Sequence, residues 1–152
     1  MKDPTMVQVH IARRIGAEVE YLALKRSDDE DIYPGIWQVV TGMIEPAESA
    51  QEAALRELHE EVGLRPREFY CLPYITSFYS IRRNQVQHVP VFGAIVDEDA
   101  EVVLSDEHSE YKWVSYDEIV GLLPFPSHKE GTKVMRDYVV DNKNKHLFLS
   151  TH

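Results

Sequence analysis

The chain has 152 residues, a mass of 17.6 kDa and a formal net charge of −10, with 16 lysine and arginine residues against 26 aspartate and glutamate residues. This length suits one domain with a hydrophobic core, and 43% hydrophobic with 28% charged residues is typical of globular rather than disordered proteins. The excess of acids argues against stable binding to nucleic acid, but a small anionic substrate stays compatible with an acidic pocket if divalent cations lie between the two.

Nothing in the sequence indicates a membrane segment or a second domain. The longest uncharged stretch, residues 69–81, is interrupted by Pro73 and is too short to cross a bilayer. The first residues lack the apolar core of a secretory signal, and the one cysteine, Cys71, cannot close an internal disulfide. We therefore expect a cytoplasmic protein in which residues 1–152 form a single domain and Cys71 is a core thiol.

Alternating and β-branched residues predict a series of strands in the first half of the chain. Residues 6–12 and 19–24 alternate in polarity and predict a hairpin through Gly16. Residues 27–34 carry four acids and end at Pro34, which indicates a solvated loop. Residues 37–41 predict a short strand that leads into a turn at Gly42.

A helix and further strands follow. Residues 46–62 predict the clearest helix, which ends at Gly63, and residues 69–81 and 86–96 predict two long strands joined around Asn84. A short strand is expected at 111–114, a brief helix capped by Ser115 up to residue 122, and an amphipathic helix at 129–140; residues 142–152 stay unassigned. Without regular βαβ alternation, this order predicts an α/β class with a mixed sheet covered by helices.

Three carboxylates share one side of the predicted 46–62 helix. At about 100° per residue, Glu57, Glu60 and Glu61 fall on one arc, while Ala47, Ala54, Leu55, Leu58 and Val62 fall on the buried arc. An acidic helix face is also typical of a solvated surface, so the cluster alone does not indicate a site. If the face is partly desolvated, however, the carboxylates repel one another and favour a hard cation such as Mg²⁺.

The residues around this cluster form a longer pattern. From Gly42, the sequence GMIEPAESAQEAALRELHEEVGL fits G-x5-E-x7-R-E-U-x-E-E-x-G-U, where U is a bulky apolar residue. All nine fixed positions are filled, and they are Gly42, Glu48, Arg56, Glu57, Leu58, Glu60, Glu61, Gly63 and Leu64. One departure is Ala47, where many relatives have glycine, and it bears on the conformation of the loop before the helix.

Residues 42–64 resemble the Nudix box, the loop-helix-loop motif of the Nudix (MutT-like) hydrolases. The resemblance implies an α/β/α sandwich with a mixed sheet and a pyrophosphohydrolase that uses Mg²⁺ or Mn²⁺. Gly42, Glu57, Glu60, Glu61 and the more distant Glu107 would hold the metal. Glu60, Glu107 and Arg56 would form the catalytic set, in which one acid activates water, and Glu48 would pair with the arginine.

Two flanking segments resemble the subgroup that hydrolyses dihydroneopterin triphosphate or dATP-like triphosphates. They are WQVVTG at 37–42 and EHSEYKW at 107–113. From that subgroup, Arg26 and Thr41 carry over as substrate contacts, and Glu107 as an acid that reaches the metal from a loop. Glu110 competes with Glu107 for that role. His108 is either a partner of the metal-site residues or a turn residue, and its own sequence context favours neither.

Two other functions stay open. Relatives that hydrolyse diadenosine polyphosphates or RNA 5′ pyrophosphates usually carry proline two residues before the box glycine, where this chain has Val40. Nudix-like modules that sense nucleotides without turnover commonly lose box acids, and this chain retains them all. The preferred expectation is a triphosphate pyrophosphohydrolase that releases pyrophosphate and a monophosphate. The base, the oligomeric state and the preferred metal are not predicted.

Overall fold

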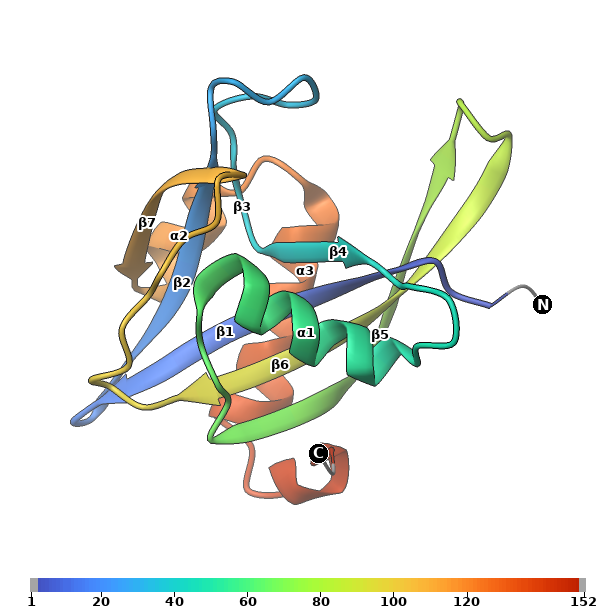
Figure 1. The fold of residues 1–152 in the computed structure, drawn as a ribbon. Helices are drawn as coiled ribbons and strands as arrows, with labels where there is room; N and C mark the ends of the chain where they lie inside the picture. Colours follow the sequence, from blue (N-terminus) through green and yellow to red (C-terminus); the bar gives the residue numbers. More distant parts are fainter. Residues whose placement is uncertain (1–2, 151–152) are drawn as a thin grey trace.

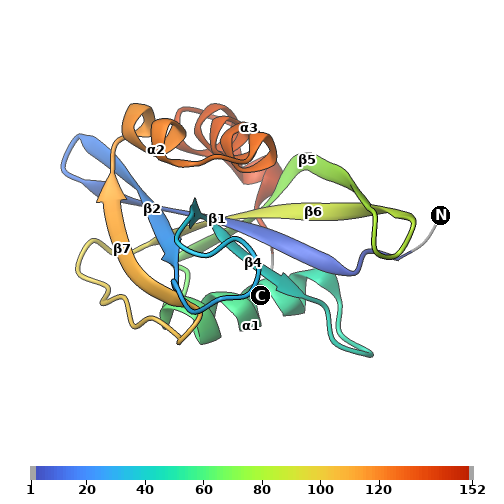
Figure 2. The same ribbon diagram turned by 90° about the horizontal axis from the view of Figure 1, so that it is seen from above.

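A mixed β-sheet lies between helices in the structure, a computed structural model that describes residues 3–150 (Figure 1). The seven strands of the sheet are β1 (Met6–Ile15), β2 (Glu18–Arg26), β3 (Trp37–Gln38), β4 (Val40–Met43), β5 (Glu68–Ser80), β6 (Gln85–Val96) and β7 (His108–Val114). Helix α1 (Ala50–Val62) covers one face, and α2 (Tyr116–Leu122) and α3 (Pro126–Met135) cover the other, as Figure 2 shows from above. The expected α/β class with a mixed sheet between helices is confirmed.

Strand β1 is the axis of the sheet because it pairs with three neighbours. On one side β1 pairs with β6 in parallel. On the other side it pairs with two antiparallel strands, with β4 along residues 6–9 and with β2 along residues 12–15. Strand β2 in turn pairs with β3 and β7. The sheet therefore forks between β2 and β4, and Val39 carries the chain from one branch to the other. This fork divides the single strand expected at 37–41 into β3 and β4.

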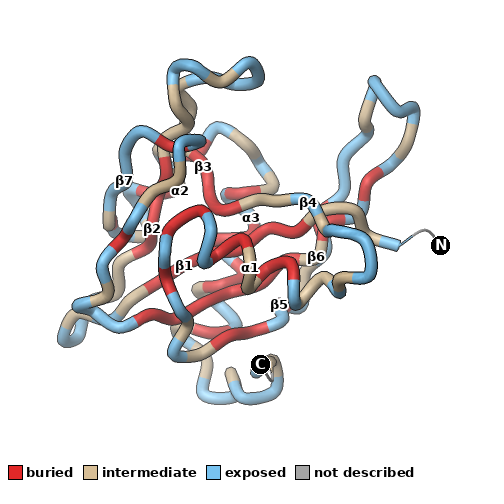
Figure 3. The backbone as a smooth tube through the Cα atoms, in the orientation of Figure 1, coloured by how far each residue is buried: buried red, intermediate tan, exposed pale blue. Residues whose placement is uncertain are grey.

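Alternating side chains give the sheet two separate cores. Val7, Val9 and Ile11 of β1 point to α1 and pack with Leu58, whereas Ala12 belongs to the core beneath α2 and α3. Figure 3 shows the buried residues concentrated in the central strands and along the inner side of α1, with the loops and the far end of the β5–β6 hairpin exposed. The two faces of the sheet therefore have different neighbours, which decides where the polar side chains lie.

Most of the predicted elements are present. The hairpin turns at Gly16 with φ of 60°, β5 and β6 meet at Asn84, and Ser115 caps α2. The third helix begins at Pro126, three residues earlier than expected, because proline fits the first turn of a helix. It is followed by a π-helical turn at Arg136–Val140. The expectation that Cys71 is a core thiol is wrong, because this residue of the edge strand β5 is exposed.

The tail left unassigned by the sequence returns to the sheet. A 3-10 turn at Lys145–Phe148 lies beside β5, where Lys145 Nζ is 2.9 Å from a carboxylate oxygen of Glu68. The Ser150 N–H donates to the carbonyl of Phe69 at 2.7 Å. Among residues 3–150, no helix combines the length and the hydrophobicity that crossing a membrane requires.

Candidate active site

Helix α1 begins later than the sequence pattern suggests, and its start sets the geometry of the site. Ser49 is the N-cap: its side chain accepts from the Glu52 N–H, and the Glu52 carboxylate accepts from the Ser49 N–H. This reciprocal pair stabilises a helix start at Ala50, so the expected start at residue 46 is wrong. At the other end, Gly63 has φ of 66°, a conformation that glycine adopts without strain, and the predicted end of the helix is confirmed.

The start of the helix leaves residues 44–49 as a loop between β4 and α1. Ala47 in this loop has φ of 65°, which is uncommon for a residue with a Cβ atom. The departure from the glycine of many relatives therefore falls at a position whose backbone favours glycine. Ala47 is exposed, so its place on the predicted buried arc of the helix is wrong, whereas Ala54, Leu58 and Val62 are buried as expected.

A cleft of about 450 Å³ opens where β4, the side of α1 and the loop before β7 meet. Five carboxylates and one guanidinium line it, those of Glu45, Glu57, Glu60, Glu61, Glu107 and Arg56. The uncharged lining residues are Met6, Thr41, Gly42 and Met43. The helix supplies four of the charged groups because spacings of three and four residues share one side. The cleft is therefore strongly acidic, and its acids come from three separate segments of the chain.

Glycine is required at position 42 by the close approach of a carboxylate. A Cβ atom built at Gly42 would lie 2.1 Å from Cδ and 2.5 Å from Oε1 of Glu57. Any side chain there would displace the Glu57 carboxylate or the strand. The main chain of β4 at Gly42 and the Glu57 carboxylate are thus packed tightly side by side in the lining of the cleft.

Arg56 connects the acids of the cleft. It donates to both oxygens of Glu48, from Nε at 2.7 Å and Nη2 at 2.9 Å, and this forked pair confirms the expected partnership. Its Nη1 donates to Glu57 at 2.8 Å and to Glu60 at 3.2 Å. The hydrogen bonds from Arg56 lower the pKa of Glu48 to about 2. One guanidinium therefore binds three of the four glutamates of the motif, and Glu61 accepts no hydrogen bond from it.

Burial and neighbouring negative charges raise the pKa of two acids in the cleft, Glu57 and Glu107. Burial raises the pKa of Glu57, despite its bond to Arg56, and the neighbouring Glu61 and Glu60 add to this. Burial also raises the pKa of Glu107, and the charge of Glu61 raises it further. For Glu61, burial acts in the same direction, but hydrogen bonds from His108 and Ser105 outweigh it, so its pKa is lowered. A bound cation would reduce the repulsion between these neighbouring carboxylates.

The donor set fits Mg²⁺ or Mn²⁺, which take carboxylate and carbonyl oxygens. Glu57, Glu61 and Glu107 line one cleft with the Gly42 main chain, and Glu60, with 53% of its side chain exposed, is on its rim. Within residues 3–150, however, no three histidine, cysteine, aspartate or glutamate side chains are already gathered as a complete ligand set. The carboxylates of Glu57 and Glu60 bind Arg56 instead, so metal binding requires them to turn from the guanidinium.

A hydrogen-bonded chain behind the cleft contains residues that the sequence did not single out. Ser105 Oγ donates to Glu61 Oε2 at 2.7 Å, and His108 Nδ1 lies 3.4 Å from the same oxygen. The other ring nitrogen of His108 is 2.8 Å from the side-chain nitrogen of Gln38 on β3. Seventy positions separate Gln38 from His108, so only the fold brings them together. His108 is thus a partner of the Glu61 carboxylate rather than a turn residue.

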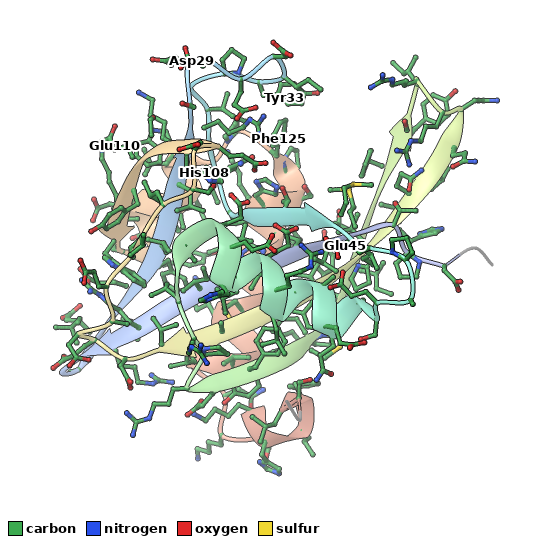
Figure 4. The ribbon with its side chains drawn as sticks, viewed as in Figure 1. Asp29, Tyr33, Glu45, His108, Glu110 and Phe125 are labelled. Atoms are coloured by element: carbon green, nitrogen blue, oxygen red, sulfur yellow. The ribbon has the colours of Figure 1, made fainter. Side chains whose placement is uncertain are left out.

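The remaining predicted site residues are distributed unevenly. Thr41 lines the cleft, but Arg26 does not: its Nε donates to the carbonyl of Ile32 and its Nη2 to Glu30 within the 27–36 loop. Of the two competing acids, Glu107 is in the cleft, whereas Glu110 is exposed on β7 and points away from α1 in Figure 4. Geometry therefore selects Glu107 over Glu110 and leaves Arg26 outside the cleft as it stands.

Known proteins resemble the chain in sequence and in structure. The NUDIX domain pattern matches residues 4–138. An octanoyltransferase of Myxococcus xanthus is 34% identical over 129 residues, or 84% of this chain and 35% of that protein, so the chain spans about a third of this relative's length. The nucleoside triphosphatase NudI of Escherichia coli K12 is 28% identical over 107 residues, 66% of this chain and 76% of NudI. A crystal structure titled as a NUDIX hydrolase of Listeria monocytogenes is 27% identical, covers 99% of this chain and 100% of its own, and has a TM-score of 0.78.

Proposed function

Because the chain belongs to the Nudix family of hydrolases, which act on pyrophosphate bonds, we propose that it is a Mg²⁺- or Mn²⁺-dependent pyrophosphohydrolase of nucleoside or pterin triphosphates. Water attacks phosphorus, one P–O–P bond breaks, and the products are the monophosphate and pyrophosphate. Substrates of the dATP or dihydroneopterin triphosphate type are favoured by the segments WQVVTG and EHSEYKW, and NudI, a relative at 28% identity, is a nucleoside triphosphatase.

The observation that carries this proposal is the charge of the cleft. Five carboxylates face one guanidinium there, and the pKa of both Glu57 and Glu107 is raised by burial. A triphosphate would be repelled by such a surface, whereas a hard dication has affinity for both the carboxylates and the phosphates. The bound ion would supply charge neutralisation for the phosphoryl oxygens and acidify water at neutral pH.

The residues of the chain have distinct roles in this proposal. Gly42, Glu57, Glu60, Glu61 and Glu107 would hold the ion, and Arg56, which binds Glu48 in the loop before α1, would release Glu57 and Glu60 to it. Glu107 or Glu60 accepts the proton of the attacking water at a carboxylate oxygen. A carboxylate with a raised pKa is better matched to this proton transfer, and this property favours Glu107 over the exposed Glu60.

The expected substrate contacts are Thr41 in the cleft and Arg26 outside it. Thr41, beside Gly42 on β4, offers a hydroxyl to the substrate. Arg26 offers a planar fork of donors suited to a phosphate, but it must first release Glu30 and the carbonyl of Ile32. Contact of Arg26 with substrate thus requires its side chain to leave these two partners in the 27–36 loop.

A panel assay tests the proposal. The chain is incubated with Mg²⁺ and dATP, the other nucleoside triphosphates, dihydroneopterin triphosphate and diadenosine tetraphosphate. Pyrophosphate released from a triphosphate is detected as phosphate after pyrophosphatase treatment. Diadenosine tetraphosphate releases no pyrophosphate, so its mononucleotide products are separated and identified by chromatography. We expect turnover of at least one triphosphate, with none in EDTA. Turnover of diadenosine tetraphosphate alone would overturn the substrate class, and tight binding of nucleotides without any turnover would overturn catalysis.

A matched pair of variants tests the role of Glu107. Glu107→Gln is expected to lower kcat by about 100-fold or more, the range for loss of a general base. Glu110→Gln changes the same residue type three positions later on the exposed side of β7 and is expected to keep wild-type kcat. Equal activity of the two variants would remove Glu107 from the mechanism and leave Glu60 as the base.

A further inference from the structure

The hydrogen bonds behind the cleft link two strands to one carboxylate of α1. Gln38 on β3 and His108 at the start of β7 are placed on the two sides of β2, and both are on the sheet face covered by α1. Only 5% of Gln38 and 5% of His108 is exposed. A buried amide, a buried imidazole and a buried carboxylate in one row are costly to assemble unless each finds a partner.

The chemistry of the two partners fixes the proton on the His108 ring. The nitrogen of the Gln38 amide, 2.8 Å from Nε2, can only donate, so Nε2 accepts and the proton of the neutral ring resides on Nδ1. This nitrogen makes no hydrogen bond of ordinary length within residues 3–150, and its nearest acidic neighbour is Glu61 Oε2 at 3.4 Å. With the amide turned the other way, a bare Nδ1 would face the carboxylate. In the orientation found, Nε2 accepts from the Gln38 amide and the N–H of Nδ1 faces the Glu61 carboxylate.

A second donor converges on the same oxygen. Ser105 Oγ donates to Glu61 Oε2 at 2.7 Å and accepts from the Glu107 N–H at 3.3 Å, and the Ser105 N–H donates to the Glu61 carbonyl at 3.1 Å. Oε2 is thus occupied by two donors, while the carboxylate still lines the cleft. The same short loop that fixes Glu61 also carries Glu107, so the orientation of two acids depends on one set of contacts.

We propose that Gln38 and His108 are positioning residues, which hold the Glu61 carboxylate, through its Oε2, in the orientation that binds the metal ion of the proposed reaction. Gln38 fixes the ring tautomer, and His108 presents an N–H to the carboxylate. This inference rests on the proposed function. Groups that orient a metal ligand in this way typically change metal affinity by about 10- to 100-fold when they are removed.

Three variants separate hydrogen bonding from packing. His108→Leu keeps a side chain of similar bulk but has no donor. His108→Asn is smaller but keeps an N–H at the position nearest to Nδ1. Gln38→Leu leaves the ring in place without the donor that fixes its proton. Glu110→Gln on the same strand is the matched control, since Glu110 is exposed and outside the cleft.

The primary measurement is the affinity for Mn²⁺ alone, followed by the loss of the free-ion electron paramagnetic resonance signal. We expect affinity to fall by about 10-fold or more in His108→Leu and by several-fold in Gln38→Leu, and to stay within about 3-fold of wild type in His108→Asn. In steady-state assays, the same variants should lose more activity at limiting Mg²⁺ than at saturating Mg²⁺, because the deficit is in metal binding. Circular dichroism and thermal unfolding without metal establish that each variant is folded.

The outcomes are distinguishable. Unchanged Mn²⁺ affinity in His108→Leu, with wild-type binding, would overturn the positioning role alone. An equal loss in His108→Leu and His108→Asn would also overturn it, since the donor would then be irrelevant. Should His108→Leu fail to fold, Gln38→Leu and His108→Asn decide by the same criteria. Absence of Mn²⁺ binding by the wild-type chain would overturn the proposed function and this role with it.

Discussion

The two faces of the sheet bury polar groups in opposite ways. Beneath α3, Gln8, His10 and Thr132 are buried and bonded to one another: Gln8 Nε2 is 2.7 Å from His10 Nε2, and Thr132 Oγ1 is 3.3 Å from His10 Nδ1. Beneath α1, the carboxylates of Glu57 and Glu61 are buried at the edge of a cleft. The first set is neutral and bonded within the protein, whereas the second belongs to a cleft in which five carboxylates share one guanidinium.

This difference separates stability from function. A satisfied neutral network costs little and fixes one packing arrangement, but it has no remaining affinity for a ligand. Buried carboxylates that repel one another destabilise the protein when no ligand is bound, and the same repulsion favours the binding of a cation. The comparison predicts that changes on the α1 face alter activity more than stability, and that changes on the α3 face do the opposite.

The largest effect is expected from Glu57→Gln on the α1 face. Activity should fall by about 100-fold or more, because a metal ligand is lost and one carboxylate of the cleft is neutralised. The free energy of unfolding without metal should change by less than about 1 kcal/mol, since burial raises the pKa of Glu57 and its charge is unfavourable there. Activity assays and urea unfolding check the two values. A large loss of stability with full specific activity would reverse the assignment of the faces.

On the α3 face, acid should destabilise the fold through His10. Burial lowers the pKa of this residue to about 3, and the nearby His128, whose own pKa is lowered to about 4 by burial, adds to the effect. The unfolded chain therefore binds protons more readily than the folded chain, so stability is complete above about pH 6.5 and is lost as the pH falls toward 3. For His10 alone the loss is about 2 kcal/mol at pH 5 relative to pH 7.

The control for this prediction is His10→Gln, which cannot be protonated. Urea unfolding at pH 7 and pH 5 should show a smaller difference for the variant by about 2 kcal/mol, whatever its stability at pH 7. An equal difference in both proteins would mean that His10 is protonated in the folded state, and the neutral network would then be misassigned.

A smaller effect on stability is expected in the loop of residues 44–49, between β4 and α1. Ala47→Gly should raise the free energy of unfolding by about 0.5 to 1 kcal/mol, because glycine adopts the observed φ of 65° without strain. Ala47 is outside the cleft lining, so KM and kcat should stay at wild-type values. Thermal unfolding with a matched Ala→Gly change in helix α1, Ala50→Gly, gives the contrast, since that change should destabilise.

Residues 42–64 show best which features of the fold and the site the sequence predicts. Periodicity and Gly63 located the helix and its end, and the spacing of Glu57, Glu60 and Glu61 placed them on one side. The predicted start at residue 46 is wrong, although the sequence carries the local signal for the true start: Ser49 and Glu52 form the S-x-x-E signature of a capping box.

Other features depend on tertiary contacts that no local pattern encodes. Gln38 and His108 are joined only because β3 and β7 attach to opposite sides of β2, and the sequence left His108 undecided. The resemblance predicts that Arg26 contacts substrate, yet its side chain donates to the Ile32 carbonyl and to the Glu30 carboxylate. Cys71 follows two buried residues on β5 but is exposed, which its sequence neighbours do not indicate.

The central claim is that the carboxylates of α1 and Glu107 hold a divalent cation which in turn holds a triphosphate. Crystals grown with Mn²⁺ and a nonhydrolysable nucleoside triphosphate, measured at the manganese absorption edge, test it directly. We expect an anomalous peak in the cleft within about 2.0 to 2.3 Å of oxygens of Glu57 and Glu61 and of the nucleotide phosphates. Nucleotide bound without any anomalous peak beside these carboxylates would contradict the account.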